Sequence, residues 1–348
     1  MPEMKKVRLG RTGLMVTKTS FGALPIQRVS FAEAGELLRT AYEAGINFFD
    51  TANAYTDSEE KIGEALSDVR KDIIIATKSA YTTPGNADMV KRNLELSLKH
   101  MKTDYIDILQ FHNPEFCPKE DDPAYQYLLE MKRQGVVRHI GITNHRLFVA
   151  HEAIDSGLYE TLQFPFSVLC TDKDLEVVDK CAKADVGFIC MKAMSGGLIR
   201  EPRATFAFLQ NYPVVPIYGV QRMSELKEWL DLDANPPVWD DEVKASVERE
   251  KKELSGDFCR GCDYCQPCPK QIPISMAARI QFFLTRAPYK PYLTPEWREK
   301  MDRVDECIHC NHCKKHCPFG LDTPALLASQ KAWYDGFYEE HKHEVTAG

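Results

Sequence analysis

The sequence predicts a closed (β/α)8 TIM barrel with an N-terminal β-hairpin, followed by a small, mainly helical unit rich in cysteine. Two observations predict the barrel. Eight short apolar runs recur within the first 220 residues at intervals of roughly 25–30 residues, and helical patterns fill the gaps between them. A third observation predicts the second unit, because eight cysteines crowd into two short runs beyond residue 257.

The eight apolar runs have the composition of buried parallel strands. Most are continuously apolar rather than alternating, as expected for strands that are covered on both faces. A doubly wound sheet is the alternative, but no G-x-G-x-x-G motif follows a first strand. Two short β runs around "GRTG" predict the hairpin. The expected barrel strands are residues 16–22, 46–50, 72–78, 105–112, 138–144, 161–167, 186–193 and 214–219.

Capping residues suggest where helices begin and end. A helix from Phe31 is expected to end before Gly45, which suits the position after a helix. Ser224 is the expected N-cap of the helix after the eighth strand, and the stretch from Tyr334 is expected to be a frayed tail. The expected domains are a barrel over residues 1–232, a linker and helix over 233–256, and the cysteine-rich unit over 257–348.

Composition and charge argue against two classes of partner. The 348 residues carry a net charge of −7, which disfavours nucleic acid as the main partner. No apolar run reaches the roughly 18 residues of a membrane span, and the first residues lack the apolar core of a signal peptide. The sequence therefore predicts a cytoplasmic protein, where clustered cysteines are metal ligands more often than disulfides.

Ionisable side chains follow three consecutive strands. Asp50 ends the second strand, Tyr55 lies in the loop after it, Lys78 ends the third strand and His112 the fourth. Chemistry in such a barrel takes place at the C-terminal ends of the strands, so these four residues are expected to converge. An ammonium beside a tyrosine lowers the phenol pKa, which would suit proton donation to a developing alkoxide. Asp50 can fix Lys78, and His112 can orient the substrate oxygen.

Four segments resemble the aldo/keto reductase family and occur in the order and spacing of that family. They are "GINFFDTANAYTDSEEKIGEAL", "IIIATK", "DYIDILQFHN" and "GVVRHIGITN", and the resemblance covers about residues 5–232. It implies a catalytic tetrad of Asp50, Tyr55, Lys78 and His112, with Tyr55 as general acid. The implied reaction is the NADP- or NAD-dependent reduction of an aldehyde or ketone to an alcohol, or its reverse.

The same resemblance implies that the nicotinamide cofactor extends across the barrel mouth without a Rossmann fold. After the eighth strand, Gly219 permits close backbone approach, and Arg222 can bind an adenosine 2′-phosphate bidentately, which favours NADP. Glu225 brings a carboxylate to the same place, so the choice between NADP and NAD stays open. The other residues at matching positions are Gly22, Ala23, Asp50, Thr143, Asn144 and Gln163, with Lys192 and Gly197 in the loop that covers the pyrophosphate.

The substrate pocket is expected to be apolar and aromatic. Loops around the mouth bring Pro25, Tyr81 and Phe116 to it. This lining predicts a small or mid-sized carbonyl compound, or the corresponding alcohol, as substrate.

The two cysteine runs have the spacing of iron–sulfur ligands. The first reads C-x2-C-x2-C-x2-C-P and the second C-x2-C-x2-C-x3-C-P, which is the bacterial ferredoxin pattern. Zinc is the alternative, but zinc ligands usually stand in two separated C-x2-C pairs. The expected ligands of two 4Fe–4S clusters are Cys259, Cys262, Cys265, Cys268, Cys307, Cys310, Cys313 and Cys317.

This region resembles two-cluster ferredoxins, in which the fourth cysteine of each run serves the other cluster. The resemblance implies that Cys317 completes the cluster of the first run and Cys268 that of the second. A hydride carries two electrons whereas a cluster passes one at a time, so two further functions stay open. One is a redox enzyme that exchanges electrons with an external ferredoxin or other carrier. In that case a flavin or the bound substrate in the barrel would collect the electrons, although no flavin motif is visible. The other is a non-enzymatic electron-transfer module.

Overall fold

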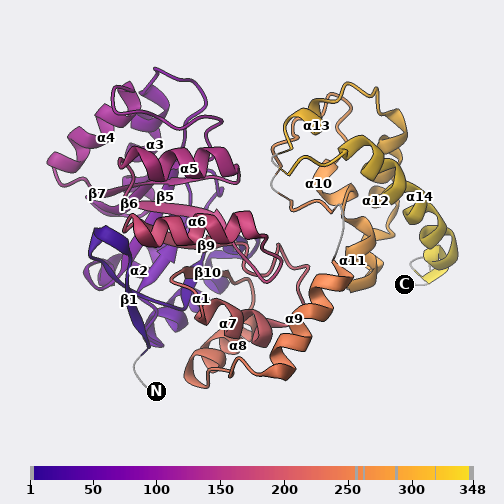
Figure 1. The fold of residues 1–348 in the computed structure, drawn as a ribbon, viewed down its shortest axis with the longest axis horizontal. Coiled ribbons are helices and arrows are strands. Elements are labelled where there is room, and N and C mark those ends of the chain that lie inside the picture. The colour runs from indigo at the N-terminus through magenta and orange to yellow at the C-terminus, as the bar shows by residue number, and fades with distance from the viewer. Residues whose placement is uncertain (1–3, 255–257, 262, 287–288, 318, 345–348) are drawn as a thin grey trace. The chain divides into compact units, whose positions relative to one another are not determined.

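The computed structural model describes residues 4–254, 258–261, 263–286, 289–317 and 319–344. The chain divides into two compact units (Figure 1). The first comprises the residues up to Ala193 together with Glu201–Val247, and the second comprises Met194–Arg200 together with the residues from Glu248 onward. The short segment Met194–Arg200 therefore belongs to the second unit although the barrel precedes and follows it in sequence.

The first unit contains a closed barrel of eight parallel strands, which confirms the predicted fold. Seven of the expected runs form one barrel strand each, because continuous apolar segments can be buried on both faces. The first expected run, residues 16–22, divides between the hairpin and the barrel. In order around the barrel, the strands are β10 (Val215–Gly219), β3 (Ser20–Gly22), β4 (Phe48–Asp50), β5 (Ile74–Ala80), β6 (Ile106–His112), β7 (Val137–Thr143), β8 (Thr161–Pro165) and β9 (Gly187–Met191).

An antiparallel hairpin lies where the barrel strands begin. It pairs β1 (Lys6–Arg8) with β2 (Met15–Thr17), as the sequence predicted. Leu9 and Val16 belong to one buried cluster with Phe48 and Ile108 of the barrel. Leu9 packs closely against Gly187, the first residue of β9. A side chain on Gly187 would prevent this contact, because its Cβ would lie 2.7 Å from Leu9 Cγ. The hairpin therefore covers the end of the barrel opposite the predicted site.

Helices surround the barrel (Figure 1). The first begins with a capping box, in which Ser30 and Glu33 exchange hydrogen bonds, and it ends before Gly45, whose φ is +104°. The helix after the eighth strand begins at Met223, so Ser224 lies inside it and the expected N-cap is wrong. The helices of this unit are α1 (Phe31–Glu43), α2 (Ser58–Leu66), α3 (Asp88–His100), α4 (Pro123–Arg133), α5 (Leu147–Ser156), α6 (Asp172–Lys183), α7 (Pro202–Gln210) and α8 (Met223–Ala234).

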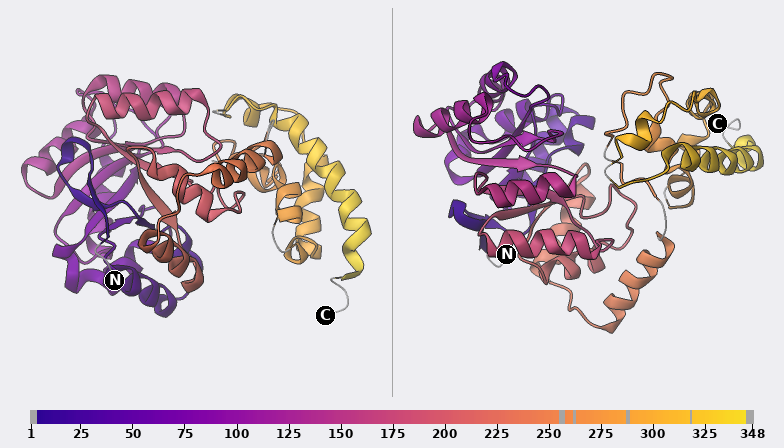
Figure 2. Two further views of the ribbon diagram at one scale, coloured as in Figure 1. Left: turned by 60° about the horizontal axis from the view of Figure 1, so that its bottom comes forward. Right: turned by 45° about the horizontal axis from the view of Figure 1, so that its top comes forward.

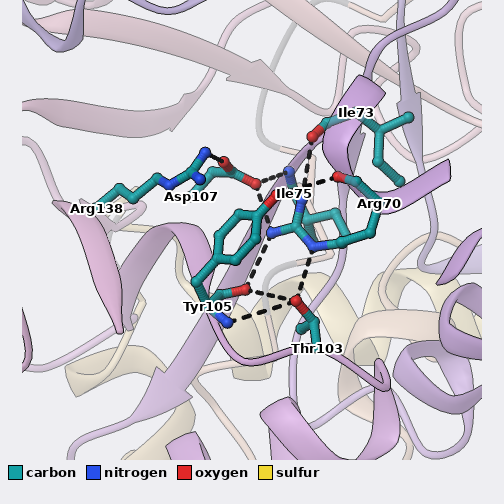
Figure 3. A network of polar contacts seen from close by, with 7 residues as sticks. All are labelled: Arg70, Ile73, Ile75, Thr103, Tyr105, Asp107 and Arg138. Carbon is teal, nitrogen blue, oxygen red and sulfur yellow. Dashed lines mark hydrogen bonds and ion pairs between the residues drawn. The ribbon is translucent and has the colours of Figure 1, made fainter. Parts of the chain in front are cut away.

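A buried ion network joins the beginnings of β5, β6 and β7 (Figure 3). Asp107, 1% exposed, accepts from Arg70 at 2.7 Å and from Arg138 at 2.9 Å. The same carboxylate accepts the backbone N–H of Ile75 at 3.0 Å, and both guanidinium groups stack on Tyr105. Because it lies at the end where strands begin, we interpret this network as stabilising the barrel.

The second unit is helical, as the sequence predicted (Figure 2). Its described core includes Ile272, Leu284, Met301 and Leu327. None of the described helices is long and apolar enough to cross a membrane. The helices that complete the chain are α9 (Asp241–Glu253), which spans the boundary between the units, and α10 (Ile274–Ala277), α11 (Ile280–Arg286), α12 (Pro295–Asp302), α13 (His312–Lys315) and α14 (Thr323–His341).

The expectation of a frayed tail from Tyr334 is wrong, because α14 continues to His341. The Tyr334 ring is fully buried, and its hydroxyl donates to the Tyr292 carbonyl oxygen at 2.9 Å. Arg298 lies over the same ring, with 5.8 Å between the guanidinium carbon and the ring centroid. These contacts with α12 and the turn before it order the last helix.

Candidate active site and cysteine cavities

Register brings the predicted barrel residues to one edge. Gly219 is paired with Gly22, which lies beside Asp50 in the next strand. On the other side, His112 is paired with Thr143, and Thr143 with Gln163. Because all the strands are parallel, these positions form one rim at the C-terminal end of the barrel.

A buried ion pair joins β4 to β5 at this rim. Lys78 Nζ lies 2.7 Å from Asp50 Oδ1, and it also donates to the Thr51 carbonyl oxygen at 2.5 Å. Both side chains are almost fully excluded from solvent. The strand β5 continues to Ala80, so Lys78 lies two residues before the strand end rather than at it. The ammonium is therefore fixed below the rim.

The loop between β4 and α2 holds Tyr55 over this pair. Its backbone is fixed by hydrogen bonds from Tyr55 N to Ala52 O and from Asn53 N to Lys78 O. Lys78 Nζ lies 5.2 Å from the centroid of the Tyr55 ring. The Tyr55 ring meets the His112 ring edge to face, with 5.9 Å between centroids. The four residues predicted to converge are thus neighbours in space.

Burial controls the protonation of these groups. It raises the pKa of the Tyr55 phenol above its usual value, and the opposing Lys78 ammonium does not reverse that shift. The expected lowering of this pKa is therefore wrong for the chain by itself. Burial also raises the pKa of Asp50, against the effect of Lys78. It lowers the pKa of His112 to about 3, with Lys78 acting in the same direction, so His112 is neutral at pH 7.

A chain of buried amides lies beside Asp50. Gln110 Nε2 donates to Gln163 Oε1 at 2.8 Å, and Gln163 Nε2 lies 3.4 Å from Asp50 Oδ1. Within the described part of the chain, Asp50 Oδ2 and Gln110 Oε1 are buried without a hydrogen-bond partner. A buried acceptor without a donor is costly, so both atoms suit the hydroxyl or amide of a bound molecule. Gln110 was not predicted, because a glutamine within an apolar strand gives no signal of its partners.

Thr143, the last residue of β7, and Asn144, the next residue, have different partners. The Asn144 side chain accepts the backbone N–H groups of His145 and Arg146, both at 2.9 Å, and donates to Pro114 O at 2.7 Å. Asn144 thus builds the turn after the strand, and its amide nitrogen has a second hydrogen to donate. Thr143 is buried, with Oγ1 3.9 Å from Met191 Sδ.

Close backbone packing explains Gly22 and Ala23. A Cβ on Gly22 would lie 3.1 Å from the carbonyl oxygens of Ile217 and Tyr218, so a side chain there would press on β10. Ala23 is fully buried, and its backbone N–H donates to Asp50 O at 2.8 Å. Both residues form barrel wall beside Asp50.

The turn after β10 carries an exposed arginine and a bound carboxylate. Glu225 accepts the backbone N–H groups of Gln221 at 2.8 Å and Arg222 at 3.0 Å. The Arg222 side chain is exposed and makes no ion pair with any described residue. A Cβ on Gly219 would lie 3.1 Å from Pro25 Cγ, so this glycine packs against the turn after β3.

The loop after β9 divides between the two units. Lys192, half-buried and with a φ of +57°, belongs to the barrel unit. Burial lowers the pKa of His145, and the nearby Lys192 ammonium acts in the same direction. Gly197, with a φ of +90°, belongs to the second unit. Lys192 and Gly197, the two residues predicted to cover the pyrophosphate, thus belong to different units.

The structure corrects the expectation for Tyr81 as a pocket residue. Its ring is 1% exposed and packs between Phe111 and Phe116. Its hydroxyl donates to the Asp122 carboxylate at 2.7 Å. Tyr81 is therefore a core residue, whereas Pro25 and Phe116 remain half-exposed.

Glu59 is a buried carboxylate that sequence reasoning missed. Its carboxylate accepts from Thr77 at 2.5 Å, from Ser97 at 2.7 Å and from Asn53 at 3.3 Å. Asn53 belongs to the loop that carries Tyr55, so Glu59 ties this loop to the helices behind it. A glutamate at a helix start usually lies on the surface, which is why the sequence alone did not single it out.

Cysteines of both runs line a first cavity in the second unit. The first run contributes two of them and the second run contributes three. They are Cys265, Cys268, Cys307, Cys310 and Cys313. Ile272, Ile274 and Leu327 complete its apolar wall.

A second cavity is lined by Cys259 and Cys265 together with Cys317 of the second run. Cys262 lies outside the described residues. Each cavity thus combines cysteines from both runs, as the ferredoxin resemblance implies. Cys265 borders both cavities.

The lining of the two cavities suits clusters. The first gathers five cysteines and the second gathers three, and in each case they come from both runs. A cubane binds each thiolate through a different iron atom, so its ligands can come from separate turns of the chain. The cysteines around both cavities, among the described residues that omit Cys262, therefore fit 4Fe–4S clusters.

Family models match both units. The model of the aldo/keto reductase family matches residues 17–211, and that of a 4Fe-4S dicluster domain matches residues 258–321. L-galactose dehydrogenase of Arabidopsis thaliana is 35% identical over 172 residues, which is 44% of this chain and 53% of that protein. An uncharacterized oxidoreductase, YqkF of Bacillus subtilis, is 32% identical over 177 residues, which is 47% of this chain and 57% of its own. The chain thus matches little more than half the length of these relatives.

Solved structures share the barrel. The holo form of aldo-keto reductase AKR11C1 from Bacillus halodurans aligns with a TM-score of 0.62 at 22% identity, over 71% of this chain and 96% of that one. The thermostable aldo-keto reductase Tm1743 aligns with a TM-score of 0.58 at 26% identity, over 70% of this chain and 99% of that one. Since one family model covers more than half of its residues and the fold agrees, the chain belongs to the aldo/keto reductase family and carries a 4Fe-4S dicluster domain after its barrel.

Proposed function

We propose that the barrel catalyses the nicotinamide-dependent reduction of a small aldehyde or ketone to an alcohol, or the reverse oxidation. The observation that carries the proposal is the buried Lys78–Asp50 pair, with the Tyr55 ring 5.2 Å from Lys78 Nζ and His112 against the same ring. A phenol, an ammonium and a neutral imidazole at one rim can stabilise and protonate an alkoxide.

Each of the four residues has a distinct role in this proposal. Tyr55 is protonated at pH 7 because its pKa is raised, so its hydroxyl donates the proton to the substrate oxygen. The Lys78 ammonium stabilises the phenolate that remains, and Asp50 holds that ammonium in place. His112, neutral at pH 7, donates a hydrogen bond that orients the substrate carbonyl.

Residues of the rim would hold the cofactor, which supplies the hydride when bound. Asp50 Oδ2, buried and without a described partner, can accept from a ribose hydroxyl. Gln163, Thr143 and the second Asn144 N–H can bind the nicotinamide end. Arg222, exposed beside Gly219, can pair with an adenosine 2′-phosphate, which favours NADP over NAD.

A second candidate function is electron exchange with an external carrier, because one cavity reaches the surface. Cys310, which lines that cavity, is exposed, and the neighbouring Ile308 side chain is 58% exposed. A cluster held there would have little protein between it and solvent, so a carrier such as a ferredoxin could approach it. In this reading the clusters deliver or remove single electrons.

Anaerobically purified protein tests both candidates. We expect oxidation of NADPH in the presence of a carbonyl panel, and a loss of about 100-fold or more in Tyr55→Phe. Tyr125→Phe, which removes a hydroxyl bonded to Leu158 O away from the rim, is the matched control and should keep full activity. Full activity of Tyr55→Phe would contradict its role as general acid.

The second candidate has its own readout. Clusters reduced with dithionite are mixed with each carbonyl in the absence of nicotinamide, and their visible absorbance is followed. Reoxidation by substrate supports electron delivery from the clusters. Stable reduced clusters together with active NADPH oxidation would leave only the carbonyl reductase.

A further inference from the structure

A buried arginine of the second unit has no carboxylate partner among the described residues. Arg279 lies between α10 and α11 and is 7% exposed. Its Nε donates to Ser275 O at 2.8 Å, its Nη2 lies 3.9 Å from Met276 Sδ, and its Cζ lies 5.0 Å from the Phe283 ring centroid. A buried charge is costly unless a counter-charge compensates it, and none of these contacts supplies one.

The guanidinium lies against the first cysteine run. A Cβ placed on Gly261 would be 2.7 Å from Arg279 Cζ and from both of its terminal nitrogens. Gly261 has a φ of +63°, and its backbone N–H points to Cys259 Sγ at 3.4 Å. The arginine thus lies beside a proposed cluster ligand, and a side chain at position 261 would have to displace the guanidinium.

The same guanidinium lies against the segment Met194–Arg200. A Cβ on Gly196 would be 3.3 Å from Arg279 Nη1. The other end of the segment is fixed by Arg200, whose Nη2 donates to Thr285 O at 2.7 Å and whose backbone N–H lies 3.3 Å from Glu250 Oε1. Arg279 is therefore shared between the first cysteine run and the loop that follows β9.

We propose that Arg279 is the buried counter-charge of the cluster held by Cys259, and that it holds the loop Met194–Arg200 against that cluster's binding turn. Four thiolates outweigh the positive charge of the iron–sulfur core, so a bound cluster supplies the negative charge that the guanidinium lacks. Adding an electron increases that negative charge, so Arg279 stabilises the reduced cluster and raises its reduction potential. Arg279 acts as a positioning and potential-tuning residue.

One side chain would then connect the charge of the cluster with the order of the segment Met194–Arg200. Removing the cluster would then loosen the loop.

Redox titration followed by electron paramagnetic resonance tests the first part. In Arg279→Gln we expect one cluster signal to titrate at a more negative potential and the other to be unchanged. Arg279→Lys keeps the charge and should lie between Arg279→Gln and the unaltered protein. Arg298→Gln is the control, since Arg298 already pairs with Asp302 and Asp335 and should leave both potentials unchanged.

The iron content and the reduction potentials of the Arg279 variants decide the first part of the proposal. If Arg279→Gln loses half of its iron, the cluster requires the counter-charge, and Arg279→Lys then carries the potential measurement. Two unchanged potentials in a fully loaded Arg279→Gln protein would overturn the proposal.

Hydrogen exchange of the peptide 194–200 tests the second part. We expect faster exchange in Arg279→Gln, and in the unaltered protein after its clusters are removed, than in the loaded protein. Exchange that is the same in all three samples would overturn the link to the loop. Neither measurement needs turnover, so both can succeed in a protein that fails to reduce any carbonyl, and the two failures are distinguishable.

Discussion

Lys78 Nζ and Asp50 Oδ1 lie 2.7 Å apart in the barrel wall, and both side chains are almost fully buried. Burial of the two charges is tolerable because each is the other's partner, and the Thr51 carbonyl oxygen accepts a second bond from the ammonium. The Tyr55 ring lies over this pair, with its centroid 5.2 Å from Lys78 Nζ. Removal of the pair should therefore affect both folding and chemistry.

Asp50→Asn should lower both stability and activity. The substitution leaves a buried ammonium without its counter-charge, which costs about 3–5 kcal/mol of unfolding free energy. Asp107→Asn is the matched control, since Asp107 is equally buried and paired but lies where the strands begin. Denaturant titration should show losses in both variants, whereas kcat per folded molecule should fall only in Asp50→Asn. Equal losses of kcat in the two would separate the pair from the chemistry.

The reduction rate should be independent of pH between about 6 and 9. The raised pKa of Tyr55 keeps the phenol protonated through this range, so the proton donor is always loaded. Carbonyl reduction should decline only above about pH 10, where the phenol ionises. Ultraviolet titration of the protein against Tyr55→Phe checks the assignment directly. A phenolate signal from Tyr55 below pH 8 would show that Lys78 outweighs burial.

Stability should fall as the pH falls below 6.5, in part because of His112. Its pKa is about 3 in the folded chain and 6.5 when unperturbed, so the unfolded chain takes up a proton first. The stabilisation is therefore complete above pH 6.5 and is lost progressively towards pH 3, by at most about 1.4 kcal/mol per pH unit. In His112→Gln the loss between pH 7 and 4.5 should be smaller. His151→Gln, on a helix outside the rim, should behave like the unaltered protein; a His112 variant that does the same would contradict the assignment.

The arrangement of the rim could be predicted because parallel strands fix it. Once Asp50, Lys78 and His112 are placed near the ends of consecutive strands, register alone brings them together. The depth of burial could not be predicted, because it depends on the loops above the rim. For that reason the pKa of Tyr55 shifts in the opposite direction to the one expected.

Contacts between residues distant in sequence could not be predicted either. The charged stretch from Tyr334 has the composition of a tail, and only contacts with Tyr292 and Arg298 reveal a packed helix. Arg279 reads as an ordinary helical arginine, and its position beside Gly261 and Gly196 depends on three separate segments. Such contacts are set by tertiary packing, on which local patterns carry no information.

Arg222 and Glu225 should set the choice of dinucleotide. Arg222→Gln should raise the Kd for NADPH about tenfold or more and leave that for NADH unchanged, because only NADPH carries the 2′-phosphate. Glu225→Gln should tighten NADPH binding, because it removes a negative charge that would repel the 2′-phosphate. The Glu225 carboxylate lies beside Arg222, since it accepts the backbone N–H groups of Gln221 and Arg222. Fluorescence titration measures both, with Lys227→Gln on the same helix as the control. Equal effects on NADH and NADPH would place Arg222 away from the phosphate.

Paired cysteine substitutions should reveal how the two runs share their clusters. If Cys317 completes the cluster of Cys259, replacing both by alanine removes one cluster and leaves about four iron atoms per chain. If Cys268 belongs to the other cluster, replacing Cys259 and Cys268 together should remove both clusters and nearly all the iron. The cavities support this division, since Cys317 borders the same one as Cys259, and Cys268 borders the other.

Iron and sulfide analysis of the two double variants decides between the arrangements, because each removes two thiols and differs only in which run supplies the second. A division run by run predicts the reverse result: the Cys259 and Cys268 pair would then keep one cluster, and the Cys259 and Cys317 pair would keep none. The electron paramagnetic resonance signal of the retained cluster identifies it, since Arg279→Gln should shift its potential only when it is the cluster that includes Cys259. That signal should therefore be insensitive to Arg279 in the Cys259 and Cys317 double variant.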